Sequence, residues 1–122
     1  MSEDPSSVSD DVRHQALVKW LKDLDDLVRL FLTRLPLAKP WQRQLISDLG
    51  VVDRAIEVFR MTVAMERPDA EIVEAAQRLA QTCRKAATVI AGARCDSETK
   101  AAIRLIVNLS ARLHNAARSA DQ

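Results

Sequence analysis

The sequence of 122 residues contains only two glycines, four prolines and no tyrosine. Glycine and proline interrupt helices and tyrosine favours strands, so their scarcity, together with abundant alanine and leucine, is typical of long helices. With Gly50 and Gly92 as its only glycines, the chain has neither a phosphate-binding loop nor a dinucleotide-binding fingerprint. We therefore predict an all-α protein and expect no nucleotide hydrolysis.

Cysteines and long apolar runs are scarce as well. Two cysteines, Cys83 and Cys95, are too few for a disulfide framework, which favours a reducing compartment. The longest apolar candidate, residues 24–37, is interrupted by charges and a proline and is shorter than the roughly 20 residues that a membrane span needs. Residues 1–11 are acidic and rich in serine, unlike a secretion signal. We expect a cytoplasmic protein outside the membrane.

Apolar residues recur at helical spacing in four stretches of the chain. In residues 41–65 they fall at alternating steps of four and three, the pattern of a helix with one buried side. Because such steps repeat every seven residues, the helices are expected to cross at the shallow left-handed angle of bundles. The expected helices span residues 9–34, 40–66, 69–92 and 97–119.

Only a few residues connect each expected helix to the next, and short connections join antiparallel neighbours. The sequence therefore predicts an antiparallel up-down-up-down four-helix bundle. Residues 9–120 form its single domain, and residues 1–8 form a flexible polar tail. The expected helix-end residues are Ser7 or Ser9, Pro40, Asp69, Asp96 or Ser97 as starts, and Pro68 and a left-handed Gly92 as ends.

The expected core consists of the apolar residues on the buried side of each helix. In chain order they are Leu17, Trp20 or Leu21, Leu24, Leu27 or Val28, Phe31, Leu35; Leu45, Leu49, Val52, Ile56, Phe59, Val63; Ile72, Ala76, Leu79, Cys83, Ala86 or Ala87, Ile90; Ala102, Leu105 or Ile106, Leu109, Leu113 and Ala116. Gly50 falls off the buried side, where we expect a close approach of another backbone or a local bend. Met61 also falls outside it, which favours self-association.

A search for catalytic or metal-binding patterns finds none with convincing spacing. No glutamate stands three residues before a histidine, as a di-iron bundle requires. His14 and His114 are expected at the same end of the bundle, but zinc needs three or four ligands, so we interpret them as solvated. Cys83 is expected in the core, and Cys95, beside Arg94, lacks a histidine base and is interpreted as an exposed thiol. We predict a protein that is not an enzyme and has no cofactor or small-molecule substrate.

The formal net charge of +1 conceals a gradient along the chain. Residues 1–26 contain seven acids and three bases, residues 27–76 seven of each, and residues 77–122 three acids and eight bases. A basic helical surface can follow the phosphates of RNA or DNA, although solvated cations are the simpler interpretation and no aromatic platform for bases is evident. The predicted nucleic-acid-binding residues are Arg78, Lys85, Lys100, Arg104, Arg112 and Arg118, with Arg84 as a further candidate.

A few residues also carry a resemblance to a known family. They are Trp20, the Leu35-Pro36 turn, Arg43 with Leu45, and the Arg78-Leu79 pair. With these residues, the region from about 16 to 114 resembles the four-helix-bundle accessory proteins of diversity-generating retroelements and their ribosomal intervening-sequence relatives. The resemblance implies an oligomeric, barrel-like assembly that binds a reverse transcriptase and its RNA through basic surfaces. The sequence departs from it at residues 115–117, which read Asn-Ala-Ala where that family tends to have Gly-Gly-Trp, and in its low net charge.

Together these observations predict an accessory or adaptor subunit without catalytic activity. It would form a homo-oligomer and bind a nucleic acid, or an enzyme that acts on nucleic acids, through the last two helices. The alternative is a protein-only oligomeric scaffold with no nucleic-acid partner.

Overall fold

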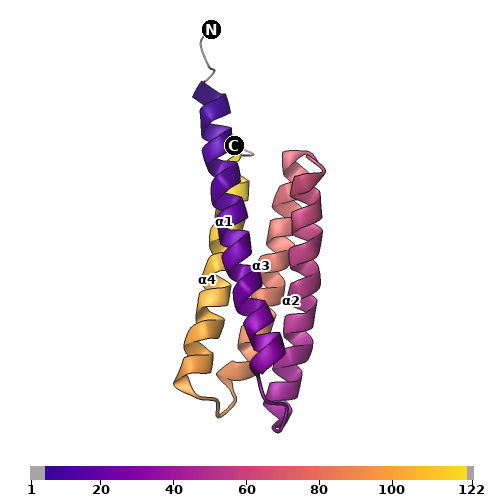
Figure 1. Cartoon of the computed structure of the whole chain (residues 1–122), viewed down its shortest axis with the longest axis vertical. Helices are drawn as coiled ribbons and strands as arrows, with labels where there is room; N and C mark the ends of the chain where they lie inside the picture. The colour runs from indigo at the N-terminus through magenta and orange to yellow at the C-terminus, as the bar shows by residue number, and fades with distance from the viewer. Residues whose placement is uncertain (1–4, 121–122) are drawn as a thin grey trace.

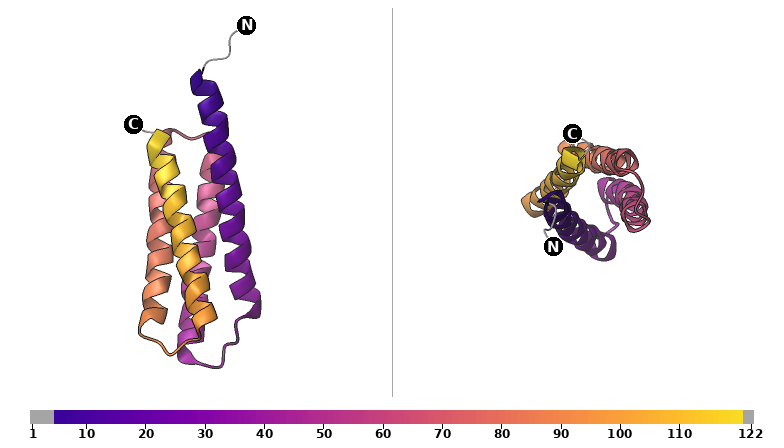
Figure 2. Two further views of the ribbon diagram at one scale, coloured as in Figure 1. Left: turned by 90° about the vertical axis from the view of Figure 1, so that its left-hand side faces the viewer. Right: turned by 90° about the horizontal axis from the view of Figure 1, so that it is seen from above.

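The structure is a computed structural model that describes the backbone of residues 5–120 and the side chains of residues 12–119. It contains four helices, α1 (Pro5–Arg34), α2 (Pro40–Ala64), α3 (Asp69–Ala91) and α4 (Ser97–Ala120), and no strand among the described residues. Successive helices run in opposite directions and pack on one another, and α4 closes the bundle against α1 (Figures 1 and 2). The predicted four-helix bundle is confirmed.

The start of α1 and the end of α2 differ most from the prediction. α1 begins at Pro5 and not near residue 9, so Ser7 and Ser9 lie inside the helix and do not cap it. Proline suits the first position of a helix because the N–H that it lacks would have no partner there. Residues 1–4 of the expected tail lie outside the described residues. α2 ends at Ala64, two residues before the expected 66, because Glu66 adopts a positive φ of 54° and turns the chain.

The sequence identifies two of the helix starts correctly. α2 begins at Pro40, as expected. Asp96 caps α4, because its carboxylate accepts bonds from the backbone N–H of Thr99 at 3.0 Å and from the Thr99 hydroxyl at 2.7 Å. Asp69, however, is the first residue of α3 and not its cap, which is Pro68.

The left-handed conformation expected of Gly92 and the close backbone approach expected at Gly50 are both wrong. Gly92 follows α3 with φ of −97°, so it does not adopt the left-handed conformation. Nothing lies within 4 Å of the position that a Cβ atom of Gly50 would occupy, so no other backbone approaches it closely. α2 continues through Gly50 without interruption.

In the first three helices the core lies mostly where the apolar periodicity places it, although the expected Phe31, Leu35, Val63 and Ile72 are half-buried and pack against its edge. Leu45, Leu49, Val52, Ile56 and Phe59 of α2 are fully buried. The buried residues of α1 and α3 are Leu17, Leu21, Leu24, Val28, Ala75, Ala76, Leu79, Ala80, Cys83, Ala86 and Ile90. Burial raises the pKa of the Cys83 thiol to about 11, so this cysteine stays protonated at neutral pH and is unreactive.

On α4, Ile106, Leu109 and Leu113 are buried as expected, but the buried residues at the two ends of the helix differ by one position from the prediction. Ile103 and Ala117 are buried, whereas the expected Ala102 and Ala116 are only half-buried. Leu105 and Ile106 were alternative predictions for one core residue. Ile106 is fully buried, and Leu105 is 48% exposed. Alanines contribute little apolar area, so the sequence alone determines poorly which residues at the ends of this helix are buried.

At one end of the bundle, the first turns of α1 extend beyond the other three helices, close to the end of α4 (Figures 1 and 2). The turn between α2 and α3 lies at this same end, and the other two connections lie at the opposite end. Within residues 5–120, no helix is both long and apolar enough to cross a membrane.

Candidate nucleic-acid interface

The six cations predicted from the sequence all have exposed side chains on the two basic helices. Arg78 and Lys85 lie on α3, and Lys100, Arg104, Arg112 and Arg118 lie on α4. The two helices are neighbours in the bundle and run side by side (Figure 2). Whether these residues bind nucleic acid stays a prediction.

On α3, Arg78, Arg84 and Lys85 all have exposed side chains. The charge of Arg84 contributes to lowering the pKa of His114 on α4. With about 100° between successive residues, Lys85 lies about 100° and Arg78 about 120° from Arg84 around the helix, in the same sense. Arg78 forms an ion pair with Glu74 of its own helix at 2.9 Å.

His114 of α4 is half-buried. Its pKa lies below the ordinary value of 6.5 because burial disfavours the charged imidazolium and because the charges of Arg118 and Arg84 repel it. Arg118 follows His114 by four residues and so lies next to it on the helix surface. The side chain of Arg118 is exposed.

Several of the cations on α1 and α2 are paired with acids. Asp25 is buried and accepts bonds from Arg29 Nε and from Arg60 Nη2, both at 3.1 Å, which ties α1 to α2. Lys22 pairs with Asp26 at 2.9 Å. By contrast, no cation from Arg84 to Arg118 has an ion pair within residues 12–119.

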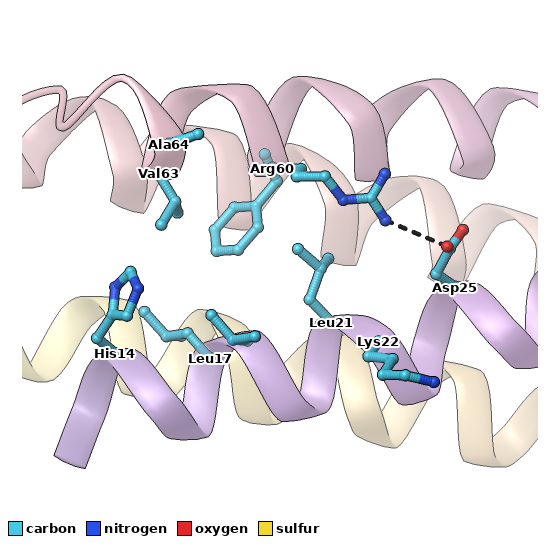
Figure 3. A pocket seen from close by; sticks show the side chains of 10 residues that line it. His14, Leu17, Leu21, Lys22, Asp25, Arg60, Val63 and Ala64 are labelled. Carbon is cyan, nitrogen blue, oxygen red and sulfur yellow. Dashed lines mark hydrogen bonds and ion pairs between the residues drawn. The ribbon is translucent and has the colours of Figure 1, made fainter. Parts of the chain in front are cut away.

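A second concave site lies between α1 and α2, with a volume of about 360 Å³ (Figure 3). Apolar side chains from both helices line most of it: Leu17, Val18 and Leu21 of α1, and Phe59, Val63 and Ala64 of α2. Figure 3 shows His14 at one end and the Asp25–Arg60 ion pair at the other. This groove has the size of a small-ligand pocket, but Asp25 and Arg60 are already paired with each other, and Lys22 is paired with Asp26 outside the groove.

The two histidines differ in their surroundings. His14 is exposed and lines the α1–α2 groove, and His114 is half-buried on α4. Among the described residues, no three His, Cys, Asp or Glu side chains come together as metal ligands. Cys95, expected to be exposed, is half-buried and packs against the core.

The outward side of α2 is apolar near its C-terminal end. Val51, Val58, Met61 and Met65 are 40–64% exposed and follow one another at steps of seven, three and four residues. This is the spacing at which one helix packs against another in a coiled coil. The expectation that Met61 lies outside the core is confirmed, and the sequence missed the rest of the row because each member is an isolated apolar residue between polar ones.

Comparisons with protein-family models, curated proteins and solved structures find no match to this sequence. The resemblance to the retroelement accessory proteins therefore stays a prediction.

Proposed function

We propose that this protein is a non-enzymatic accessory or adaptor subunit that binds a nucleic-acid strand, RNA or DNA, through α3 and α4. The observation that carries the proposal is a set of exposed cations that have no acidic partner among the described residues. The set, called the α3–α4 basic surface below, is Arg84, Lys85, Arg94, Lys100, Arg104, Arg112 and Arg118. In the sequence between Arg84 and Arg118 the only acids are Asp96 and Glu98, which stand at the start of α4.

The pairing of the cations supports a role in binding over a role in folding. On α1 and α2, cations such as Arg29 and Arg60 meet carboxylates and so contribute to helix contacts. On the α3–α4 basic surface, like charges repel one another with no compensation from neighbouring residues, unless a polyanion is present. A nucleic acid that docks there gains free energy from the counterions that it releases.

The partner enzyme is the less defined part of the proposal. The resemblance of residues 16–114 to retroelement accessory proteins favours a reverse transcriptase and its RNA. In such a complex, the basic surface would contact the nucleic acid and the remaining faces would be free for contacts between proteins.

The proposal is tested by reversing two charges on the α3–α4 basic surface. Arg104→Glu combined with Arg112→Glu should abolish retention of a labelled single-stranded RNA or DNA, measured by fluorescence anisotropy. Both side chains are exposed, so helical content and melting temperature should barely change. Wild-type affinity should fall as salt rises from about 50 to 200 mM, with a slope of roughly −0.7 per phosphate contact in a double-logarithmic plot.

A matched control carries the same charge change on the other half of the bundle. Lys19→Glu with Arg54→Glu alters two exposed cations of α1 and α2 and should leave most of the affinity intact. Equal losses of affinity in both variants would show that binding depends only on the net charge of the protein. Undiminished binding by the Arg104 and Arg112 variant would reject the basic surface as the interface.

A protein-only oligomeric scaffold is the second candidate, favoured by the apolar row on α2. If Val58, Met61 and Met65 pack against a second copy, Met61→Glu with Met65→Glu should convert an oligomer into a monomer in light scattering after size exclusion. Leu30→Glu with Leu105→Glu, which changes two exposed leucines of α1 and α4, is the control and should not do so. A wild-type monomer at all concentrations would reject this candidate.

A further inference from the structure

The surface between α1 and α4 holds a groove made of two adjoining hollows. The hollows have volumes of about 400 and 240 Å³, and both are lined by Leu27 and Leu30 of α1. α1 and α4 pack on each other and lie side by side along this surface (Figure 2). The α1–α4 groove, as it is called below, is lined by apolar side chains of both helices, among them Leu27, Leu30 and Phe31 of α1 and Leu105 and Leu109 of α4.

Two leucines, one on each helix, are exposed in this groove. Leu30 is 45% exposed and Leu105 is 48% exposed. Large apolar side chains that stay in water on neighbouring helices mark a surface for a partner. Buried Leu109 and half-buried Phe31 line the groove as well and pack in the core or against it. A partner that covers the two leucines would therefore extend the core of the bundle outward.

Charges of opposite sign stand on α1 at the two ends of the groove. Asp23 lines one hollow and Arg34 lines the other. Both are exposed, and neither has an ion pair within residues 12–119, whereas Asp26 is paired with Lys22. Asp23 and Arg34 are eleven residues apart, which is about 16 Å along a helix and only about 20° around it. The two charges therefore lie on the same side of α1, with the leucines of the groove between them.

We propose that the α1–α4 groove binds an amphipathic helix of a partner protein. A helix that lies in such a groove inserts apolar side chains spaced by three and four residues. Opposite Asp23 and Arg34 it presents a basic and an acidic residue about eleven positions apart, because that spacing covers the same three turns. The inference rests on the proposed function only in that an accessory subunit has a protein partner.

The shape of the groove favours a separate helix over a second copy of the chain. Two copies related by a two-fold axis present the same patch to each other, so one groove would face the other and neither would be filled. The charges alone would permit that contact, because Asp23 of one copy would meet Arg34 of the other. A single helix presents a convex side to the groove and meets both charges.

The first test measures binding of a labelled synthetic peptide by fluorescence anisotropy. The peptide is an amphipathic helix with leucines on one side, and with a glutamate and a lysine at the two ends of that side, at the spacing of Arg34 and Asp23. Leu30→Gln with Leu105→Gln changes no charge and should weaken binding by about tenfold or more, because both exposed leucines lose their apolar contacts. Met61→Gln with Met65→Gln is the matched control on α2 and should retain the affinity.

A measurement on the wild-type protein makes this test independent of how the variants fold. In NMR spectra, the peptide should shift the methyl signals of Leu27, Leu30 and Leu109 and leave those of Val58 on α2 nearly unchanged. Absence of peptide binding, equal losses in the leucine and methionine variants, or shifts confined to α2 would each overturn the proposal.

The second test reverses the charge at one end of the groove. Asp23→Lys should weaken binding of the peptide by up to about fivefold, the effect of one exposed charge pair. A second peptide, with glutamate in place of its lysine, should bind Asp23→Lys more tightly than it binds the wild type. Reversal of the peptide in the groove cannot produce this result, because the variant has cations at both ends. If the wild type and the variant preferred the same peptide, the charges would not position the partner, and the proposal would fail.

Two further measurements separate the groove from the proposed function and from self-association. Leu30→Gln with Leu105→Gln should retain the wild-type affinity for a labelled oligonucleotide. Peptide binding without oligonucleotide binding would support the groove and reject the nucleic-acid function, and the converse result would reject the groove alone. In light scattering without peptide, this variant should have the same mass as the wild type. A change from oligomer to monomer would mean that a second copy occupies the groove, which would overturn the proposal.

Discussion

At the scale of single residues, Gly50 lowers the stability of α2 although the fold does not require a glycine there. It lies inside α2, and nothing lies within 4 Å of the position that a Cβ atom would occupy. Glycine in a helix interior is about 1 kcal/mol less favourable than alanine, because it loses more backbone freedom on folding. Gly50→Ala should therefore raise the free energy of unfolding by about 1 kcal/mol, measured by urea denaturation.

Gly92 provides the comparison for this prediction. A Cβ atom would also meet nothing within 4 Å there, but Gly92 follows the last turn of α3 and is not in its interior. Gly92→Ala should thus stabilise less than Gly50→Ala. A loss of stability in Gly50→Ala would show that α2 needs this glycine, for instance for a contact with another molecule.

At the scale of elements, the burial pattern of α4 leads to a prediction about stability that the apolar periodicity alone would not give. Ile103 is almost fully buried, whereas Leu105 is 48% exposed. Truncation of a buried isoleucine removes apolar contacts and leaves a cavity, so Ile103→Ala should cost about 2 to 5 kcal/mol. Leu105→Ala should cost less than about 1 kcal/mol. Similar losses in thermal or urea denaturation would mean that α4 is rotated differently.

The parts of the fold that could be predicted from the sequence are those determined by residues close by in the chain. Pro40 and Asp96 act on the backbone next to them, so the helix starts that they mark were predicted correctly. The prediction of the buried side of α2 rests on large apolar side chains and was also correct. The conformations of Glu66 and Gly92 depend on how the chain turns between packed helices, which no local pattern records.

The candidate site was predicted only in part, for a related reason. Exposure of Arg104 and Arg112 follows from their place opposite the apolar residues of α4. Which of Arg84 and Lys85 faces α4 depends on how α3 is rotated in the bundle, because the two are adjacent in sequence but about 100° apart around the helix. A sequence without an alignment gives their charge but not the neighbour that each one meets.

At the scale of the whole molecule, the charges divide the bundle into two halves. α1 and α2 contain a network centred on the buried Asp25, in which arginines from both helices meet one carboxylate. α3 and α4 contain the unpaired cations of the α3–α4 basic surface. The near-zero net charge of the chain therefore hides an electrostatic potential that is positive on one side, which can steer a polyanion to that side.

This division predicts how the whole bundle responds to a nucleic acid. A ligand that binds only the folded state stabilises it, so a single-stranded oligonucleotide at about a hundred times its Kd should add about 2.7 kcal/mol to the free energy of unfolding. In a thermal melt, the midpoint should rise by roughly 10 °C. Because counterion release drives binding, the rise should shrink between about 50 and 200 mM salt.

The Arg104→Glu and Arg112→Glu variant distinguishes this effect from nonspecific stabilisation. It retains the helices and the paired charges of α1 and α2, so it should melt near the wild-type temperature without oligonucleotide and should show no rise with it. If the rise persisted in this variant but disappeared in the Lys19→Glu and Arg54→Glu control, the nucleic acid would contact α1 and α2. The unpaired cations of α3 and α4 would then be a solvated surface, and the scaffold would become the better account of the protein.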